Sequence, residues 1–453
     1  MQISQILLRS PARITIIGFV LVILSGTLLL MLPQASVNVS LGFTDSLFTS
    51  TSAVCVTGLT VVDTGSAFTA FGQTVLLVLI QTGGLGIMTI ATLFILIAGK
   101  RLSFTNCNAI EDTFTHTSNR SISSIIKSVA LFTLVFESLG AVLIFLCFLP
   151  DHETQKALYL SVFHSISAFC NSGFCLFSDS FAGYQTNWKL NLIICFLVIA
   201  GGIGFPVLSE LKYRFSRKRR IWARLSLHSK LVLSTTALLL LVSTMMILFM
   251  EWNNTLNHLK PLNRLISAFF QAVNARTSGF NTLPIGNMAN ETLFVLILFM
   301  FIGASPGSCG GGIKTTTFAI LAVLGISRFR GYERPQLFGR LLTEKSIGKT
   351  VRVVLISAIV VCIGLMLLLM TELGGIPHPQ ARGKFLELFF EVISAFGTVG
   401  LSTGITGSLS VPGKIIITFI MFVGRLGPLL IAMAVSQSVT SYYSYAEEDV
   451  MIG

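Results

Sequence analysis

Residues 267–280 read SAFFQAVNARTSGF, and altered copies of this stretch occur at three other places in the chain. Aligned on one glycine, the four copies read FTSTSAVCVTGL, FHSISAFCNSGF, FFQAVNARTSGF and FEVISAFGTVGL. The aligned glycines are Gly58, Gly173, Gly279 and Gly400, which lie 115, 106 and 121 residues apart. Because internal repeats determine architecture, the sequence predicts four equivalent units.

The composition is that of a membrane protein. Of 453 residues, 53% are hydrophobic and 11% are charged, whereas soluble proteins have about 25% charged residues. Eight apolar runs are each near the roughly 20 residues with which a helix crosses a bilayer. These runs are 14–32, 74–98, 129–149, 190–208, 231–250, 293–302 together with 318–326, 351–370 and 415–435. The sequence therefore predicts eight spans in a lipid membrane.

The net charge of +12 comes from basic residues that cluster between alternate spans. Positive loops face the cytoplasm, so both termini should be cytoplasmic and the four repeated stretches should lie toward the outside. The alternative is that these basic clusters form a specific binding site for lipid or RNA, but no nucleic-acid partner is expected. The clusters are Lys100, Arg101 and Arg120; Lys212, Arg214, Arg217, Lys218, Arg219, Arg220, Arg224 and Lys230; and Arg328, Arg330, Arg334, Arg340, Lys345 and Lys349.

Each repeated stretch lies between two spans and is too rich in Ser, Thr and Gly to cross the membrane itself. We expect it to enter and leave on one side, as a short helix followed by a loop through the glycine. The predicted fold is an all-α integral membrane protein with four tandem units of helix, re-entrant pore loop and helix around a central pore. The units are 1–110, 111–221, 222–340 and 341–437, followed by a cytoplasmic tail, 438–453.

The loops through the glycines are candidates for a cation filter. Non-helical backbone at membrane depth is tolerated where it is buried in protein or lines a water-filled cavity. Carbonyl oxygens there can replace the hydration shell of an ion, and the negative C-terminal end of each short helix favours a cation. Simple helix capping by the glycines is the alternative. The predicted filter comprises Val56, Thr57, Gly58, Asn171, Ser172, Gly173, Thr277, Ser278, Gly279, Thr398, Val399 and Gly400.

Residues 303–317 read GASPGSCGGGIKTTT and interrupt the second span of the third unit. Five glycines and a proline do not sustain a helix. The phosphate-loop pattern fails because Ile313 stands where lysine is required. We interpret this loop as a gate below the filter, with a structural kink as the alternative, and expect the third unit alone to have a broken second span. The gate residues are Gly303, Ser305, Pro306, Gly307, Ser308, Gly310, Gly311, Gly312, Lys314 and Arg425.

Charged residues inside the spans are functional by default. Arg425 should latch the gate by binding its carbonyls, or else form an inert ion pair. Arg276 should be braced by Glu391, with Glu387 as the other candidate. Glu137 and His164 have no assignable partner, and a buried, hydrogen-bonded role is expected for both.

An enzyme is not expected, because the six histidines show no metal-ligand spacing. The eight cysteines form no CxxC pair and are interpreted as reduced apolar residues. A secondary transporter for another solute remains an alternative, but its usual inverted repeat is absent.

Together, VTGL (56–59), NSGF (171–174), TSGF (277–280), TVGL (398–401), the loop 303–317 and GRLGP (424–428) resemble the Trk/Ktr/HKT superfamily of potassium transporters. The resemblance covers nearly the whole chain and is greatest to the bacterial Ktr-type membrane subunit, because the extra N-terminal spans of Trk-type subunits are missing. Cys309 stands where related loops often have threonine.

This resemblance implies potassium uptake through Gly58, Gly173, Gly279 and Gly400. It also implies a homodimer in the bacterial inner membrane, seated on a cytosolic ring of nucleotide-binding (KtrA-like) regulatory subunits on which ATP and ADP act. In plant members, serine at the position of the first glycine accompanies sodium selectivity. Glycine at this position, Gly58, therefore favours a potassium pathway over a sodium-conducting pathway. The residues leave open whether sodium activates transport and whether flux is channel-like or coupled.

Overall fold

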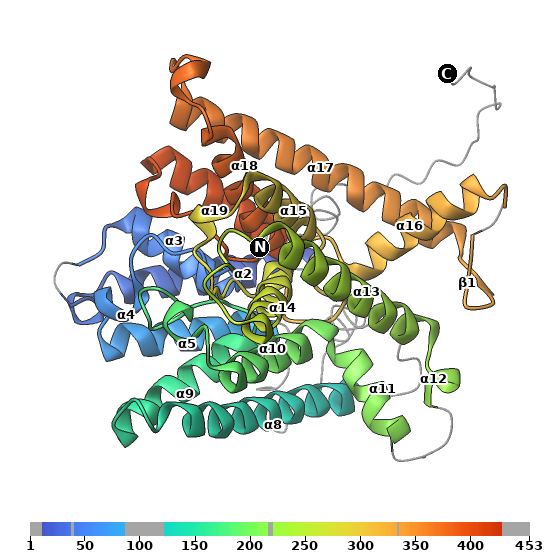
Figure 1. Ribbon diagram of the computed structural model, residues 1–453, viewed down its shortest axis with the longest axis horizontal. Helices are drawn as coiled ribbons and strands as arrows, with labels where there is room; N and C mark the ends of the chain where they lie inside the picture. Colours follow the sequence, from blue (N-terminus) through green and yellow to red (C-terminus); the bar gives the residue numbers. More distant parts are fainter. Residues whose placement is uncertain (1–10, 38–39, 87–121, 216–220, 333–334, 428–453) are drawn as a thin grey trace, which may run out of the picture.

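The computed structural model describes residues 11–37, 40–86, 122–215, 221–332 and 335–427 (Figure 1). The basic residues at 100, 101, 120, 217–220 and 334, and the tail 438–453, lie outside these ranges. Of the described helices, four are long and apolar enough to cross a membrane. A fifth span results if the bent pair α10 (Trp188–Ile203) and α11 (Phe205–Phe215) is counted as one. These helices and the helical architecture agree with the predicted all-α membrane fold.

Each unit contributes a long first helix, a short pore helix and a second helix. The first helices are α2 (Pro11–Leu30), α8 (Ile122–Phe148), α13 (Leu227–Met250) and α17 (Glu344–Leu373). The pore helices are α3 (Phe43–Val54), α9 (Thr154–Phe169), α14 (Pro261–Thr277) and α18 (Lys384–Gly397). The second helices are α5 (Ala70–Leu85), α10 (Trp188–Ile203), α15 (Asn290–Phe301) and α19 (Val411–Leu426).

Shorter elements connect these helices. Among the described residues, strand structure is confined to a hairpin, β1 (Gln336–Leu337) and β2 (Arg340–Leu341), which projects with α16 at one end of the molecule (Figure 1). The remaining helices are α4 (Thr64–Ala67), α11 (Phe205–Phe215), α12 (Ile221–Arg224) and α16 (Thr315–Phe329). Single 3₁₀ turns are Pro33–Ala35, Ala182–Tyr184, Ile285–Asn287, His378–Gln380 and Thr406–Ser408.

Side-chain caps fix where three of the second helices begin. Thr69, Asn187 and Ser410 each accept a hydrogen bond from a backbone amide in the first turn of α5, α10 and α19. Such caps satisfy amides that have no intrahelical partner. The fourth helix, α15, lacks a side-chain cap of its own. Glu251, at the end of α13, instead accepts a 3.0 Å hydrogen bond from the Ala289 amide.

The four units close into a ring. The second helix of each unit packs against the pore helix of the next: α5 on α9, α10 on α14, α15 on α18 and α19 on α3. The last of these contacts joins the fourth unit to the first. There, Lys414 Nζ lies 2.8 Å from Asp45 Oδ1, and these two residues are 369 positions apart in sequence.

Three of the four second helices end directly before a glycine with a positive φ angle, which corrects one expectation. Helices α5, α10 and α19 end immediately before Gly86, Gly204 and Gly427, whose φ angles are +83°, +99° and +85°. After Gly204 the chain bends by 98° into α11. The third unit is therefore not alone in having a broken second span. Glycine adopts positive φ without steric cost, so these residues can terminate the helices.

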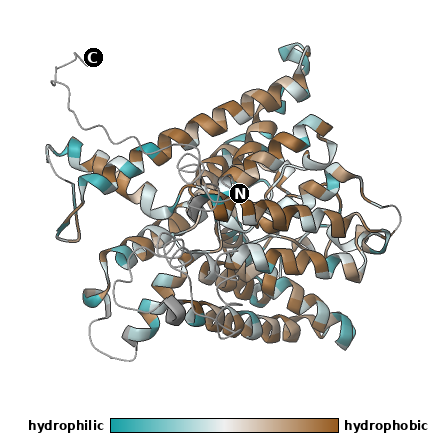
Figure 2. Cartoon of the chain, turned by 180° about the vertical axis from the view of Figure 1, so that it is seen from behind, coloured by the Kyte–Doolittle hydropathy of each residue, from teal (hydrophilic) through white to brown (hydrophobic). Residues whose placement is uncertain are grey.

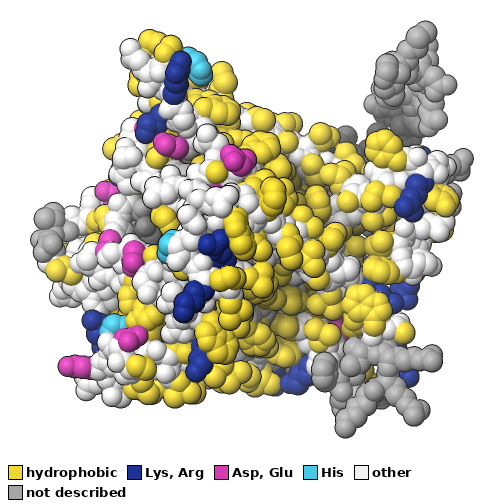
Figure 3. All heavy atoms as spheres, in the orientation of Figure 1, with side chains coloured by type: hydrophobic (Ala, Val, Ile, Leu, Met, Phe, Trp, Pro, Cys, Tyr) yellow, Lys and Arg dark blue, Asp and Glu magenta, His cyan; other side chains and the backbone are white. Residues whose placement is uncertain are grey.

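Large hydrophobic side chains are exposed along the long helices. Figure 2 shows the long helices as predominantly hydrophobic. In Figure 3, hydrophobic side chains cover the middle of the visible face, while charged side chains gather toward its two ends. This distribution is that of a bilayer-spanning protein. The largest apolar core includes residues of all four units, among them Phe48, Phe390 and Phe396, which are fully buried.

Candidate ion pathway

Gly58, Gly173, Gly279 and Gly400 form a closed ring, which we call the glycine ring. A Cβ atom added to Gly58 would lie 2.3 Å from the carbonyl oxygen of Ser172, the residue before Gly173. The same relation holds from Gly173 to the Ser278 oxygen (2.2 Å), from Gly279 to the Val399 oxygen (2.4 Å) and from Gly400 to the Thr57 oxygen (2.1 Å). Each ring glycine is thus in contact with the carbonyl of the next unit.

Two separate constraints require glycine at these positions. Their φ angles are +89°, +71°, +71° and +91°, in the region that side chains disfavour. In addition, any side chain would collide with the carbonyl oxygen of the adjacent unit. Helix capping alone would explain the backbone angles but not the contacts between units.

We call the three residues before each ring glycine a ring strand, although they form no β-strand. In three of the four ring strands, a serine of the preceding pore helix, which we call a pinning serine, accepts backbone hydrogen bonds. Ser52, Ser167 and Ser394 stand six residues before their glycines. Their carbonyl oxygens accept from the amides of Thr57, Ser172 and Val399 at 2.8, 2.8 and 2.9 Å. The Ser52 and Ser394 hydroxyls also accept from the Gly58 and Gly400 amides, both at 3.1 Å.

The third ring strand is built differently. Val273 replaces the serine, and the amides of Ser278 and Gly279 both donate to the Asn274 carbonyl. Val56, Asn171 and Thr398 have positive φ angles of 57°, 60° and 49°, whereas helix α14 continues through Thr277. Thr277 instead contacts the second ring strand, because its Oγ1 lies 2.6 Å from the Asn171 side chain.

An outer cavity of about 380 Å³ opens onto all four ring glycines. Asp63 and Asp179 line it, and its described lining contains no lysine or arginine. Burial raises the pKa of Asp63, but hydrogen bonds from Ser178, Ser66 and the Gly65 amide more than offset this, so its pKa lies below the usual value. Asp63 therefore stays negatively charged at neutral pH, which favours cations in the cavity.

The glycine-rich loop 303–314 docks onto the broken ends of the second helices. The amides of Ser305 and Cys309 donate to the carbonyls of Gly202 and Gly201 in the second unit, at 3.1 and 3.2 Å. The Gly312 amide donates to the Gly424 carbonyl in the fourth unit at 3.3 Å. The loop thus joins three units at the level where their helices end.

Contacts within the loop and with the start of α11 complete its fold. The Gly307 carbonyl accepts from the Phe205 amide at 2.9 Å, and the Pro306 carbonyl would lie 2.6 Å from a Cβ on Gly204. Ser308 Oγ donates to the Ser305 carbonyl, and the Gly303 amide donates to the Ile313 carbonyl. Lys314 Nζ donates to the Gly310 carbonyl at 2.7 Å.

Arg425 bridges the loop and the first unit. Its guanidinium donates to the carbonyl of Cys309 in the loop and to the carbonyl of Gly83 in α5. Among the described residues, Arg425 forms no ion pair with a carboxylate. Arg425 therefore contacts a carbonyl of the loop and no carboxylate among the described residues, and its role as a latch stays a prediction.

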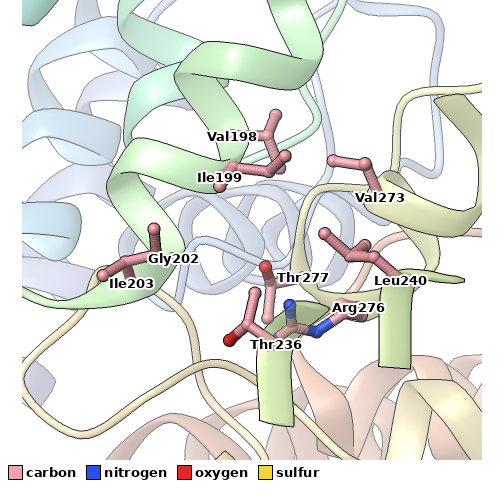
Figure 4. A pocket seen from close by; sticks show the side chains of 9 residues that line it. All are labelled: Val198, Ile199, Gly202, Ile203, Thr236, Leu240, Val273, Arg276 and Thr277. Carbon is pink, nitrogen blue, oxygen red and sulfur yellow. The ribbon is translucent and has the colours of Figure 1, made fainter. Parts of the chain in front are cut away.

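The predicted bracing of Arg276 is wrong. The structure shows no ion pair between Arg276 and either Glu391 or Glu387 in the described chain. Glu391 accepts from Thr406 Oγ1 in its own unit, and Glu387 pairs with Lys384 at 3.3 Å. The Arg276 side chain lies instead beside Thr236 and Thr277 of its own unit, at a small pocket that Gly202 and Ile203 of the second unit also line (Figure 4).

Arg276 is 7% exposed, and its Nε has no hydrogen-bond partner among the described residues. The cavity beside it measures about 10 Å³, which is near the lower limit for one water molecule. The sequence does not determine which neighbour a side chain as long as that of Arg276 contacts.

Glu137 and His164 both have the hydrogen-bonded role expected of them. Glu137 Oε2 accepts from Gln81 Nε2 at 3.2 Å. His164 is fully buried; its Nδ1 lies 2.7 Å from the Leu160 carbonyl, and its Nε2 lies 3.2 Å from the Leu176 amide. The sequence did not identify Gln81, the pinning serines or Asp63. Only the serines left a signal, because they recur at one position in three aligned copies.

Comparison with known proteins agrees with this architecture. The family model described as "TrkH: Cation transport protein" matches residues 3–442. The chain is 38% identical to Ktr system potassium uptake protein B of Bacillus subtilis, over 98% of this chain and 97% of that protein. It is 35% identical to the potassium/sodium uptake protein NtpJ of Enterococcus hirae, over 98% and 97% of the two chains.

Among solved structures, the potassium transporter TrkH from Vibrio parahaemolyticus superposes with a TM-score of 0.75 at 18% identity, covering 94% of this chain and 85% of that one. This likeness supports the fold alone. The family match and the two close relatives together show that this multi-pass membrane protein is a transporter and not an enzyme. The chain belongs to the TrkH family of cation transport proteins.

Proposed function

We propose that the chain carries potassium into the cell through the glycine ring. The observation that carries the proposal is the closure of the ring, in which every glycine contacts a carbonyl of the next unit. Closely spaced carbonyl oxygens can replace the hydration shell of a cation. The acidic outer cavity would concentrate cations at the entrance, and the names of both close relatives include potassium uptake.

The loop 303–314 is proposed as the gate. It lies directly beneath the third and fourth ring strands, since a Cβ on Gly310 would be 2.7 Å from Thr277 Cγ2 and one on Gly312 would be 3.2 Å from the Gly397 Cα. Deletion of residues 307–312 should therefore raise the uptake rate. Unchanged uptake, with equal amounts of protein in the membrane, would remove the gate from the account.

Regulation and assembly are proposed from the family. The chain would form a homodimer in the bacterial plasma membrane, with both termini cytoplasmic, on a cytosolic ring of nucleotide-binding subunits controlled by ATP and ADP. The described basic residues Lys212, Arg224, Lys230, Arg328, Arg330, Arg340, Lys345 and Lys349 suit a docking surface for that ring. The name of the Enterococcus relative, which includes sodium, supports sodium as an activator or a second transported ion.

The test is rescue of a bacterium that lacks its own potassium uptake systems. Cells that express the chain with its cytosolic partner should grow at low potassium and accumulate rubidium, measured with and without sodium. Absence of rescue, with the protein present in the membrane, would overturn the proposed function. Uptake that does not change when the partner is omitted would overturn the proposed regulation alone.

A further inference from the structure

One hydroxyl group belongs to both the gate and the glycine ring. The Gly311 amide donates to Thr398 Oγ1 at 2.8 Å in a buried hydrogen bond. Gly311 lies in the glycine-rich loop, and Thr398 lies two residues before ring glycine Gly400. The four ring residues at this position are Val56, Asn171, Thr277 and Thr398. Thr398 is the one whose side chain bonds to the described loop, because Val56 is apolar and the other two side chains bond to each other.

The fit between loop and strand leaves no room for a side chain. A Cβ on Gly311 would lie 2.6 Å from Thr398 Oγ1. The loop therefore needs glycine here in order to bring its amide to the hydroxyl. If the loop left this position, Thr398 Oγ1 would lose its donor at the inner end of the fourth ring strand. A buried oxygen without a partner is unfavourable, so another hydrogen-bond donor or a cation would have to replace the amide.

The docked loop also brings positive charge to the same place. Lys314 Nζ is bonded to the Gly310 carbonyl, and the Arg425 guanidinium to the Cys309 carbonyl, next to Gly311. The amide N–H of Gly311 presents the positive end of its dipole to Thr398 Oγ1. A cation at this oxygen and the docked loop would repel each other in a region of low dielectric constant.

We propose that Thr398 Oγ1 is a switchable cation ligand, which binds the Gly311 amide when the loop is docked and a dehydrated potassium ion when the loop is released. The inference rests on the proposed function and adds a coupling to it. Because coupling between two binding events is reciprocal, potassium at the inner end of the ring would promote release of the gate. Couplings of this kind typically change an equilibrium by roughly 5- to 150-fold.

The test is hydrogen exchange of the peptide spanning 303–314, measured by mass spectrometry on the purified full chain in detergent. Samples are compared in potassium and in an equal concentration of N-methylglucamine. Potassium should speed exchange in the parent and in Thr398→Ser, which keeps the hydroxyl. In Thr398→Val the loop should exchange rapidly in both solutions, because neither the amide nor the ion has its oxygen ligand.

Potassium-independent exchange in the parent, or a Thr398→Val protein that responds as the parent does, would overturn the coupling. Rubidium uptake by the same proteins in liposomes separates this outcome from failure of the proposed function. If the parent transports rubidium but its loop does not respond to potassium, the coupling alone fails. If the parent transports no rubidium, the proposed function fails.

Discussion

Replacement of Arg425 by methionine tests the latch. The arginine side chain holds carbonyls from two other units, Cys309 in the loop and Gly83 in α5. Methionine has a similar length and no hydrogen-bond donor, so Arg425→Met removes both bonds and leaves most of the packing. Gly83 lies in α5, outside the loop. The bond to Cys309 is thus the one that distinguishes a docked from a released loop.

The size of the effect follows from that bond. A hydrogen bond to a charged group contributes about 1.5–3 kcal/mol. Since about 1.4 kcal/mol is a factor of ten in an equilibrium constant, its loss should shift the loop toward release by roughly 10- to 100-fold. The uptake rate should rise until another step limits it.

The assay is the initial rate of rubidium uptake at low external potassium, normalised to the amount of protein in the membrane. Lys414→Met is the matched control, because it removes a cation from the same helix but contacts Asp45 and not the loop. Arg425→Met should exceed the parent and the control. An uptake rate at or below that of the parent, in a protein that still elutes as a single species in detergent, would refute the latch.

Two further predictions concern the ring and its entrance. Ser394→Ala removes the hydroxyl that accepts a hydrogen bond from the Gly400 amide, which should cost about 1 kcal/mol of stability. It should also lower the preference for potassium over sodium, measured by competitive uptake. Ser408→Ala, on an exposed turn, is the control and should change neither property. Asp63→Asn should raise the half-saturating potassium concentration roughly two- to threefold at low ionic strength and less at high salt. Because hydrogen bonds from Ser178, Ser66 and the Gly65 amide hold the pKa of Asp63 below its ordinary value, the ratio between variant and parent should be constant from pH 5 to 8. The carboxylate's contribution should be lost only as the pH falls through that lowered pKa.

The repeat predicted the fold because the same local pattern occurs four times. Glycine at a fixed place after a short amphipathic helix is informative at Gly58, Gly173, Gly279 and Gly400 alike. The alignment alone could not give the contact between each glycine and the carbonyl of the next unit. That contact depends on how the units pack around a common axis.

The breaks in the second helices were only partly predictable. The loop at 303–317 is conspicuous by composition, whereas Gly204 lies with Gly201, Gly202 and Pro206 in an apolar run that we interpreted as one continuous span. Its φ of +99° and the bend after it become evident only in the structure. Long side chains were the least predictable, because Arg276 can reach several neighbours and in the structure extends toward Thr236 and not Glu391.

Ion selectivity of Gly58→Ser is the most direct test of the central claim that the glycine ring selects potassium. Serine there would need a φ of +89° and would place its Cβ 2.3 Å from the Ser172 carbonyl oxygen, so the ring must shift. Gly42→Ser is the control, since a Cβ at Gly42 meets no atom within 4 Å. Competitive uptake of rubidium against sodium should show weakened discrimination in Gly58→Ser and parental discrimination in Gly42→Ser. Parental discrimination in a well-expressed Gly58→Ser protein would contradict the account.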